Sequence, residues 1–299
     1  MVLSSSRKRK NESPGDATIP EKDTPLITLF TSWVTKPEKY LCHNNTLFNW
    51  NSLKPDILSI LFTNESYVKK EALSKGWQVL PIRVTATKEK VPVLRHMFMD
   101  VMRVSNTPFL AYVNGDMLFT KSIVATLKSL QKAIRSSLFN ASYPVLIVGQ
   151  RLNVMNVSAD EIKSEDKIRA MAKSRGKLFT EWGEDYFITT RNYPWKNLPD
   201  VVIGRLAYDN WMVWNAKRSN FYTIDATKTL LAIHQTTKSG NFEGHKKPDG
   251  NYNNRLIQKM YKKVKYVAGR TSCAVYKTSN NSKGYIEFSK RTLNKQCQV

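Results

Sequence analysis

The sequence predicts an α/β protein with a mostly parallel central sheet and helices on both of its faces. Two apolar runs of strand length, residues 26–33 and 57–63, are followed by further runs of the same kind. Helix-like segments separate them, and strands that alternate with helices at this spacing are typical of βαβ units. The chain has 299 residues and is 41% hydrophobic, which is enough to build a sizeable core.

The first half of the chain alternates regularly between strand and helix patterns. Residues 1–24 are charged and polar with almost no large apolar side chain, so we expect a disordered basic tail. Residues 91–104 and 123–138 carry apolar side chains at helical spacing, and Gly76 is placed to end a short helix at 68–75. The expected strands are residues 26–33, 57–63, 77–82, 109–113 and 144–149, and residues 47–50 fit a further amphipathic helix.

The second half is more polar and its pattern is less regular. An acidic turn enters a predicted strand at residues 182–188, and a turn at residues 203–214 opens a helix. A last strand, residues 230–233, ends at His234. We expect residues 25–240 to form the domain that carries the site, and residues 241–299 to be a peripheral C-terminal extension.

A carboxylate follows the buried strand at residues 109–113. Gly115 permits a tight turn there, so Asp116 is expected to project from the C-terminal end of the strand, where open α/β sheets bind ligands. A carboxylate with the amide of Asn114 beside it suits a divalent cation held against phosphate oxygens. The alternative is an ordinary turn in which Asp116 caps the next helix.

The net charge and the cysteines limit the classes of protein to which this chain can belong. A net charge of +23 suits nucleic acid, an anionic membrane surface or an anionic substrate, although a solvated lysine-rich surface produces the same value. We expect no specific nucleic-acid recognition and no transmembrane segment, because no apolar run has the length of a membrane span. Cys42, Cys273 and Cys297 show neither a zinc pattern nor a disulfide framework, and one must remain unpaired.

Three polar residues of the predicted elements could assemble at one edge of the sheet. Asp116 and His234 stand at strand ends and offer oxygen and nitrogen ligands to a metal, and Asp209 opens a helix as a carboxylate base. The chain has no phosphate-binding glycine-rich loop of the P-loop or dinucleotide type and no Ser/His/Asp nucleophile motif. Phosphate binding would therefore depend on a metal and on basic residues.

Three ordered stretches, residues 112–119, 204–211 and 225–235, resemble the GT-A nucleotide-sugar glycosyltransferases. The match looks closest to a poorly characterised group of metazoan and microbial proteins with an Asn-Gly-Asp motif, and it covers about two-thirds of the chain. The resemblance implies a Rossmann-like GT-A fold that binds a nucleotide-diphosphate sugar, with Mn²⁺ or Mg²⁺ bridging the diphosphate.

The resemblance also implies roles for single residues. Asn114 and Asp116 take the place of the family's Asp-X-Asp motif, and His234 completes the metal site. Thr31 and Ser32 would face the nucleotide base and ribose. Arg205 would contact phosphate, unless it pairs with a nearby carboxylate.

Two acidic residues compete for the role of catalytic base. Asp209 is preferred to Asp185, because in the family the acidic pair opens a helix that leads through a strand to the histidine. Asp185 is expected within a strand instead. Each has an alternative structural role, Asp209 as a helix N-cap and Asp185 as a cap of a turn.

The resemblance predicts a glycosyltransferase that moves a sugar from a nucleotide-diphosphate donor to a hydroxyl of a glycan, protein or small-molecule acceptor. One alternative is a non-catalytic binding or extracellular-matrix protein that holds acidic polymers on its basic surface. Another is a nucleotidyltransferase, which attacks the α-phosphate; residues 31–35 lack the glycine-rich basic loop that would favour it.

The compartment and the metal dependence stay open at this point. The resemblance to the GT-A family and the Asn-X-Ser/Thr sequons favour the secretory pathway. The N-terminus shows no apolar signal sequence, which favours the cytoplasm. Asn114 stands where the family has the first Asp of its metal motif. That departure weakens metal affinity or indicates chemistry that needs no metal.

Overall fold

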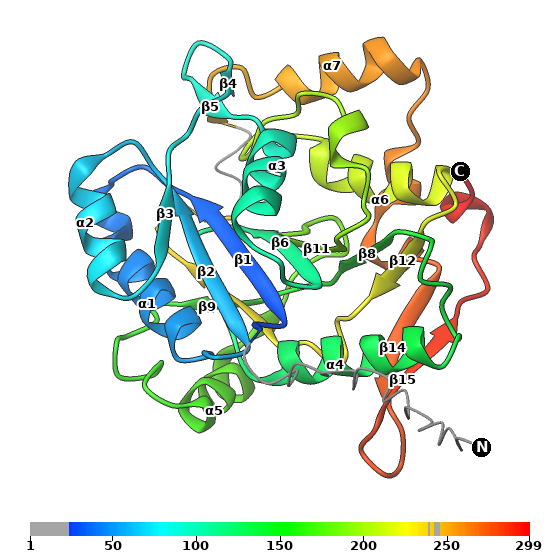
Figure 1. The fold of residues 1–299 in the computed structure, drawn as a ribbon, viewed down its shortest axis with the longest axis horizontal. Helices are drawn as coiled ribbons and strands as arrows, with labels where there is room; N and C mark the ends of the chain where they lie inside the picture. The colour runs from blue at the N-terminus through cyan, green and yellow to red at the C-terminus, as the bar shows by residue number, and fades with distance from the viewer. Residues whose placement is uncertain (1–23, 239, 242–245) are drawn as a thin grey trace, which may run out of the picture.

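A nine-stranded sheet runs through the centre of the protein, in the order β15-β14-β12-β8-β11-β6-β1-β2-β3. The computed structural model describes residues 24–238, 240–241 and 246–299 (Figure 1). Apart from Thr24, the expected basic tail of residues 1–24 lies outside them. The strands are β1 (Ile27–Ser32), β2 (Ile57–Phe62), β3 (Gln78–Leu80), β6 (Phe109–Val113), β8 (Val145–Val148), β11 (Tyr186–Thr190), β12 (Tyr222–Asp225), β14 (Tyr276–Asn280) and β15 (Ile286–Lys290).

Most neighbouring strands of this sheet are parallel. The exceptions are β11, which runs antiparallel to both β6 and β8, and β15, which is antiparallel to β14. The remaining pairs, from β6 to β3 and from β8 to β14, are parallel. The prediction of an α/β fold with a mostly parallel, Rossmann-like central sheet is confirmed.

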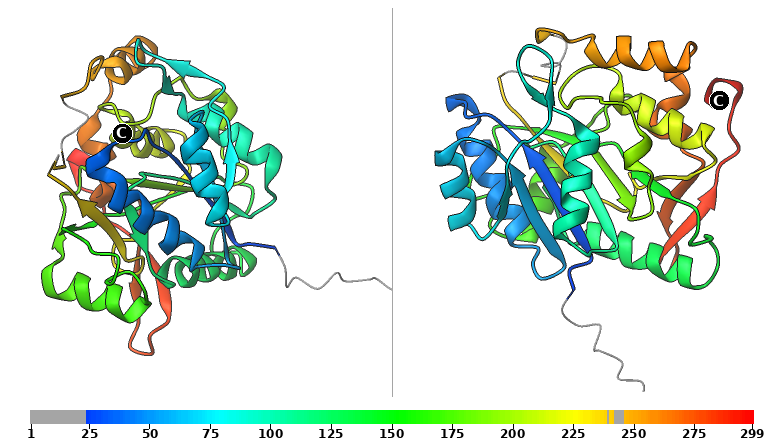
Figure 2. Two further views of the ribbon diagram at one scale, coloured as in Figure 1. Left: turned by 90° about the vertical axis from the view of Figure 1, so that its left-hand side faces the viewer. Right: turned by 45° about the horizontal axis from the view of Figure 1, so that its top comes forward.

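Helices cover both faces of the sheet. Side chains of β1 alternate between them, with Ile27 and Leu29 packed in one core and Phe30 in the other, as the twofold repeat of a strand requires. The first core includes side chains of α1 (Tyr40–Asn51), α2 (Ser66–Ser74) and α4 (Ser122–Arg135). The second includes side chains of α3 (Leu94–Val104), α6 (Tyr208–Arg218) and α7 (Tyr252–Tyr261), and Figure 2 shows the layers from two further directions.

A second, four-stranded sheet carries part of the candidate site. Its order is β10-β9-β13-β7, with β7 (Met117–Phe119), β9 (Leu152–Met155), β10 (Lys177–Leu178) and β13 (Ala232–Thr236). Helix α5 (Glu165–Arg175) packs Ile168 and Met171 against Leu118 and Ile233 of this sheet. A short hairpin of β4 (Thr85–Ala86) and β5 (Val91–Pro92) completes the strands of the described part of the chain.

The C-terminal residues 246–299 contribute two strands to the central sheet. Strand β14 joins the central sheet beside β12, and β15 forms its edge. Lys217 of α6 donates hydrogen bonds to the carbonyls of Ala268 and Cys297 and so ties the end of the chain to the core.

The cysteine pattern also needs a correction. Cys273 and Cys297 form a disulfide with Cα atoms 5.0 Å apart, whereas the sequence showed no disulfide framework. A separation of 24 residues does not by itself indicate a disulfide, and only the fold brings the two side chains together. Cys42 is buried and is not part of a disulfide.

The expected helices are present with shifted ends; residues 91–92 of the expected helix 91–104 form β5, and α3 begins at Leu94. Gly76 has a φ of +76° after α2, as the left-handed end of a helix requires. Within the described residues, no helix is both long and apolar enough to cross a bilayer.

Candidate functional site

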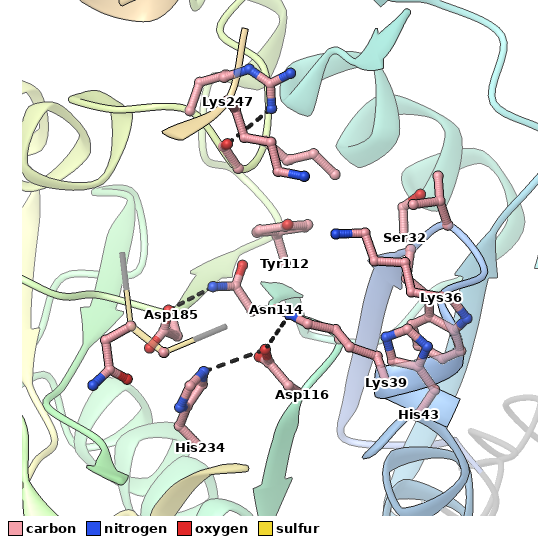
Figure 3. Close-up of a pocket in the computed structure, with 18 of the residues that line it drawn as sticks. Ser32, Lys36, Lys39, His43, Tyr112, Asn114, Asp116, Asp185, His234 and Lys247 are labelled. Carbon is pink, nitrogen blue, oxygen red and sulfur yellow. Dashed lines mark hydrogen bonds and ion pairs between the residues drawn. The ribbon is translucent and has the colours of Figure 1, made fainter. Parts of the chain in front are cut away.

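A cavity of about 300 Å³ opens beside the carboxyl ends of β1 and β6 (Figure 3). Ser32 ends β1 and Asn114 follows β6, and both line the cavity. Because β1 and β6 are parallel neighbours, their carboxyl ends lie at one edge of the sheet, where open α/β sheets bind ligands. Gly115 allows the turn to approach Trp33, since an added Cβ would lie 2.7 Å from Trp33 Cε3.

The cavity brings Asp116 and His234 together. Oδ2 of Asp116 lies 3.3 Å from Nε2 of His234 and 3.6 Å from Nζ of Lys39. Oδ1 of Asp116 is buried with no hydrogen-bond partner in the structure. Burial alone would raise the pKa of the Asp116 carboxyl, but His234, with Lys39 and Arg151 nearby, holds that pKa below its usual value.

The register of the second sheet explains why the side chains of Asp116 and His234 lie close together. His234 of β13 lies opposite Met117 of β7, and the backbone N–H of Gln235 donates to the carbonyl of Asp116 at 3.0 Å. Nδ1 of His234 lies 3.0 Å from the hydroxyl oxygen of Thr236. When that hydroxyl donates to Nδ1, the Nε2–H of a neutral ring is left to donate to Asp116.

A buried ion pair borders the same cavity. Arg151 is 4% exposed, pairs with Asp185 and places its guanidinium 4.2 Å from the centre of the Phe179 ring. The side-chain amide of Asn114 donates to Asp185 at 2.6 Å, and the Asn114 backbone N–H donates to the Asp185 carbonyl at 2.9 Å. Asp185 therefore holds Asn114 in place, and its charge is neutralised by Arg151.

Asp185 lies outside the strand in which the sequence placed it. β11 begins at Tyr186, so Asp185 directly precedes the strand. Its side chain lines the cavity, but Asn114 and Arg151 already contact both of its carboxylate oxygens. This arrangement suits a positioning group better than a proton acceptor.

Asp209 is the second residue of α6 and lies near the cavity without lining it. It does not cap the helix, because the N-cap position is Ala207 and no side chain bonds there. Burial raises the pKa of Asp209 to about 6, although Asn210, whose backbone N–H donates to Oδ1 at 3.0 Å, and the charge of Arg151 lower it. A carboxyl group with such a pKa can exchange protons near neutral pH.

Glu184 lies beside Asp209 in this buried acidic region. Its two oxygens accept from the Thr271 hydroxyl at 3.1 Å and from the Asn210 amide at 2.9 Å. Burial, then the charge of Asp209, raises the pKa of Glu184 well above its usual value. Glu184 and Asp209 are thus two carboxyl groups that resist being ionised together.

Thr31 and Arg205, both predicted to bind the donor, have surroundings that differ from the expectation. Thr31 is fully buried and does not line it, whereas its neighbour Ser32 does. Arg205 lines the cavity, but it pairs with Glu89 and donates to the carbonyls of Pro248 and Gly204 at 3.0 Å each. In the structure, Arg205 therefore has a carboxylate partner, which was the alternative to phosphate binding.

Several lining residues were not singled out from the sequence. They are Trp33, Lys36, Lys39, His43, Tyr112, Arg151 and Lys247. The rings of Trp33 and His43 are stacked with centroids 4.5 Å apart. A lysine in a chain with 47 lysines and arginines has no local signal of its own, and only the bend from β1 into α1 brings Lys36 and Lys39 to the cavity.

The site offers only part of a coordination sphere for a divalent cation. Asp116 and His234 supply an oxygen and a nitrogen donor, and the unpartnered Oδ1 of Asp116 is an atom that a cation would satisfy. Among the described residues, no group of three His, Cys, Asp or Glu side chains could hold a metal ion. The pair fits a cation whose remaining ligands come from substrate phosphates and water.

Comparison with known proteins gives likenesses of structure alone. No protein-family model and no curated protein matches the chain. A solved mycobacterial protein aligns over 89% of this chain and 84% of its own, with 9% identity and a TM-score of 0.39. CMP:2-keto-3-deoxy-manno-octonic acid synthetase, solved with CTP, aligns over 79% of this chain and 99% of its own, with 11% identity and a TM-score of 0.36. Both TM-scores are below 0.5, so the function must be argued from the site.

Proposed function

We propose that the protein is a glycosyltransferase that binds a nucleotide-diphosphate sugar in this cavity and transfers the sugar to an acceptor hydroxyl. The observation that carries the proposal is the contact of Asp116 with His234 at the carboxyl edge of the sheet, inside a cavity rich in cationic side chains. The resemblance of the sequence to GT-A enzymes points to the same two residues.

The charges around the cavity match a diphosphate. Two of its five lysine and arginine side chains are paired with carboxylates, Arg151 with Asp185 and Arg205 with Glu89. Lys36, Lys39 and Lys247 also line the cavity, around the carboxylate of Asp116. Lysine side chains gathered in a recessed cavity attract an anion such as a nucleoside diphosphate.

The remaining lining suits the nucleoside and the sugar. Ser32 offers a hydroxyl, and the stacked rings of Trp33 and His43 offer an aromatic surface for a base or a sugar. Asn114 is held by Asp185 and exposes its carbonyl oxygen as an acceptor for a donor hydroxyl.

The proton of the acceptor hydroxyl requires a base. Asp209 is the proposed base because the resemblance to GT-A enzymes assigns that role to the carboxylate at the start of this helix, whereas Asp185 is engaged with Arg151. Its pKa, raised by burial to about 6, suits proton exchange near neutral pH, although its side chain lies behind the cavity lining. A divalent cation bound by Asp116, His234 and the diphosphate would act as a Lewis acid on the leaving group.

Calorimetric titration with UDP, GDP, CDP and ADP, each with and without Mn²⁺, tests the proposal. We expect one of them to bind, its sugar conjugate to be slowly hydrolysed or transferred, and Asp116→Ala to abolish both the turnover and any response of binding to Mn²⁺. Asp160→Ala, an exposed carboxylate far from the cavity lining, is the matched control and should behave like the wild type.

Two outcomes would contradict the proposal. Absence of binding to every nucleotide, together with retention on an acidic polysaccharide column, would favour the non-catalytic binding protein. Release of pyrophosphate from a nucleoside triphosphate and a sugar would favour the nucleotidyltransferase.

A further inference from the structure

Lys39 is fixed next to Asp116 by the way helix α1 is attached. Lys39 is the last residue of the 3-10 helix η1 (Pro37–Lys39), which leads directly into α1. Its Nζ atom lies 3.6 Å from Oδ2 of Asp116, and its side chain is only 14% exposed. The ammonium group thus stands in the cavity beside the carboxylate that a metal would use (Figure 3).

Helix α1 is hydrogen-bonded along the segment that carries Asp116. Thr46 donates to the carbonyl of Gly115 at 3.0 Å, and the Trp50 indole donates to the carbonyl of Met117 at 2.9 Å. Asn49 donates to the carbonyl of Phe119 at 2.9 Å and accepts from its N–H at 2.8 Å. The distance between Lys39 and Asp116 is therefore set by buried contacts rather than by a chance encounter of two surface side chains.

Two further ammonium groups are directed at the same space. Lys36 lies one turn before Lys39, and Lys247 enters from the opposite wall (Figure 3). The three amines surround the space above Asp116, where the diphosphate is proposed to lie. An ammonium group is a compact charge suited to phosphate oxygens.

We propose that Lys39, together with Lys36 and Lys247, neutralises the donor diphosphate and so takes over in this protein the charge-neutralising role described above for a divalent cation. The same charge competes with a metal for the carboxylate of Asp116, because two cations cannot share Oδ2 without strong repulsion. This inference rests on the proposed function for its ligand, and it adds which residues neutralise that ligand. It also accounts for the Asn114 that stands where the family's metal motif has its first Asp.

Lys39→Met tests the proposal, since it keeps the length of the side chain and removes the charge. Inorganic pyrophosphate is the probe, and binding is measured by calorimetry in EDTA. We expect the wild type to bind pyrophosphate, Lys39→Met to bind it at least about tenfold more weakly, and Lys39→Arg to retain most of the affinity. Lys128→Met removes an exposed lysine that pairs with Asp56 outside the cavity, and it should have no effect.

A second readout follows the metal itself. Mn²⁺ binding to the ligand-free protein is measured by electron paramagnetic resonance, and it needs no turnover. We expect Lys39→Met to bind Mn²⁺ about tenfold more tightly than the wild type, and Lys39→Met/Asp116→Asn to lose that gain. Circular dichroism spectra that match the wild type show that the variants are folded, and Lys36→Met provides an independent loss of pyrophosphate affinity.

The outcomes separate this inference from the function on which it rests. A nucleoside diphosphate that binds the wild type only with Mn²⁺, with no tighter Mn²⁺ binding in Lys39→Met, would overturn the inference and leave the proposed function standing. A wild type that binds pyrophosphate in EDTA but no nucleotide under any condition would support the inference for the anion and overturn the proposed function.

Discussion

Nε2 of His234 lies 3.3 Å from Oδ2 of Asp116, although His234 belongs to β13 and Asp116 to the turn between β6 and β7, far away in the chain. Antiparallel pairing of β13 with β7 sets this contact, because His234 lies opposite Met117, which directly follows Asp116. The contact joins a carboxylate at the edge of the central sheet to a histidine of the second sheet. The two sheets therefore share one polar centre, and any variant that disturbs it has a defined consequence.

The first prediction concerns the stability of this pair. His234→Ala leaves the Asp116 carboxylate with Lys39 as its remaining close partner, and we expect the free energy of unfolding at pH 7 to fall by about 1–3 kcal/mol. Urea denaturation measures the change. Asp116→Asn/His234→Ala should recover part of the loss, and a fully additive double-mutant cycle would show that the two side chains are not coupled.

The second prediction concerns the attachment of α1. Asn49→Ala removes two buried hydrogen bonds to the backbone of Phe119, and we expect it to lower the free energy of unfolding by about 1–3 kcal/mol. Because the same contacts hold Lys39 near Asp116, pyrophosphate binding in EDTA should also weaken. Ser74→Ala, at the exposed end of α2, is the control, and an effect on stability without one on binding would contradict the link.

Hydrophobic patterning predicts the strands in the middle of the central sheet because they are nearly all buried. Residues 57–62 and 109–113 contain few polar side chains, and burial on both faces demands such runs. The second sheet and β14 could not be read in this way. Their strands are short and partly polar, and their pairing depends on contacts between distant parts of the chain.

The candidate site was predictable only where a residue stands next to a recognisable strand end. Asp116 follows β6 after a short turn, whereas His234, which the sequence placed at the end of a strand, lies within β13 (Ala232–Thr236). The structure brings the two side chains together. Lys39 and Arg151 have no such signal, since their positions depend on a helix orientation and on a buried ion pair. The sequence could not distinguish an Arg205 that binds phosphate from an Arg205 that pairs with a carboxylate. Tertiary packing alone brings Glu89, between β4 and β5, close to Arg205.

The third prediction concerns Arg205, which is 6% exposed and already paired. Arg205→Met leaves two backbone carbonyls and Glu89 without their donor, so we expect the free energy of unfolding to fall by about 1–3 kcal/mol. Nucleotide binding should change less than about threefold, because the guanidinium charge is neutralised by Glu89. Thermal unfolding and calorimetry check the two parts, and a tenfold loss of nucleotide affinity at wild-type stability would restore Arg205 as a phosphate ligand.

The fourth prediction concerns the pH dependence that Asp209 introduces. Burial raises its pKa in the folded protein to about 6, above the value of about 4 expected in the unfolded chain. The folded state therefore binds this proton more tightly. Asp209 costs no stability below pH 4, lowers it progressively between pH 4 and 6, and keeps that cost above pH 6.

Asp209→Asn removes this cost, so we expect the variant to be more stable than the wild type at pH 7, by about 1–2 kcal/mol, and equally stable at pH 3.5. Denaturant titrations at the two pH values measure the difference. In the proposed function, kcat/KM of the wild type rises with pH through an apparent pKa near 6, as a base that must be ionised requires. The Asn variant should lose turnover at least about a hundredfold while still binding nucleotide, and a variant that keeps both the rate and its pH profile would remove Asp209 from the chemistry.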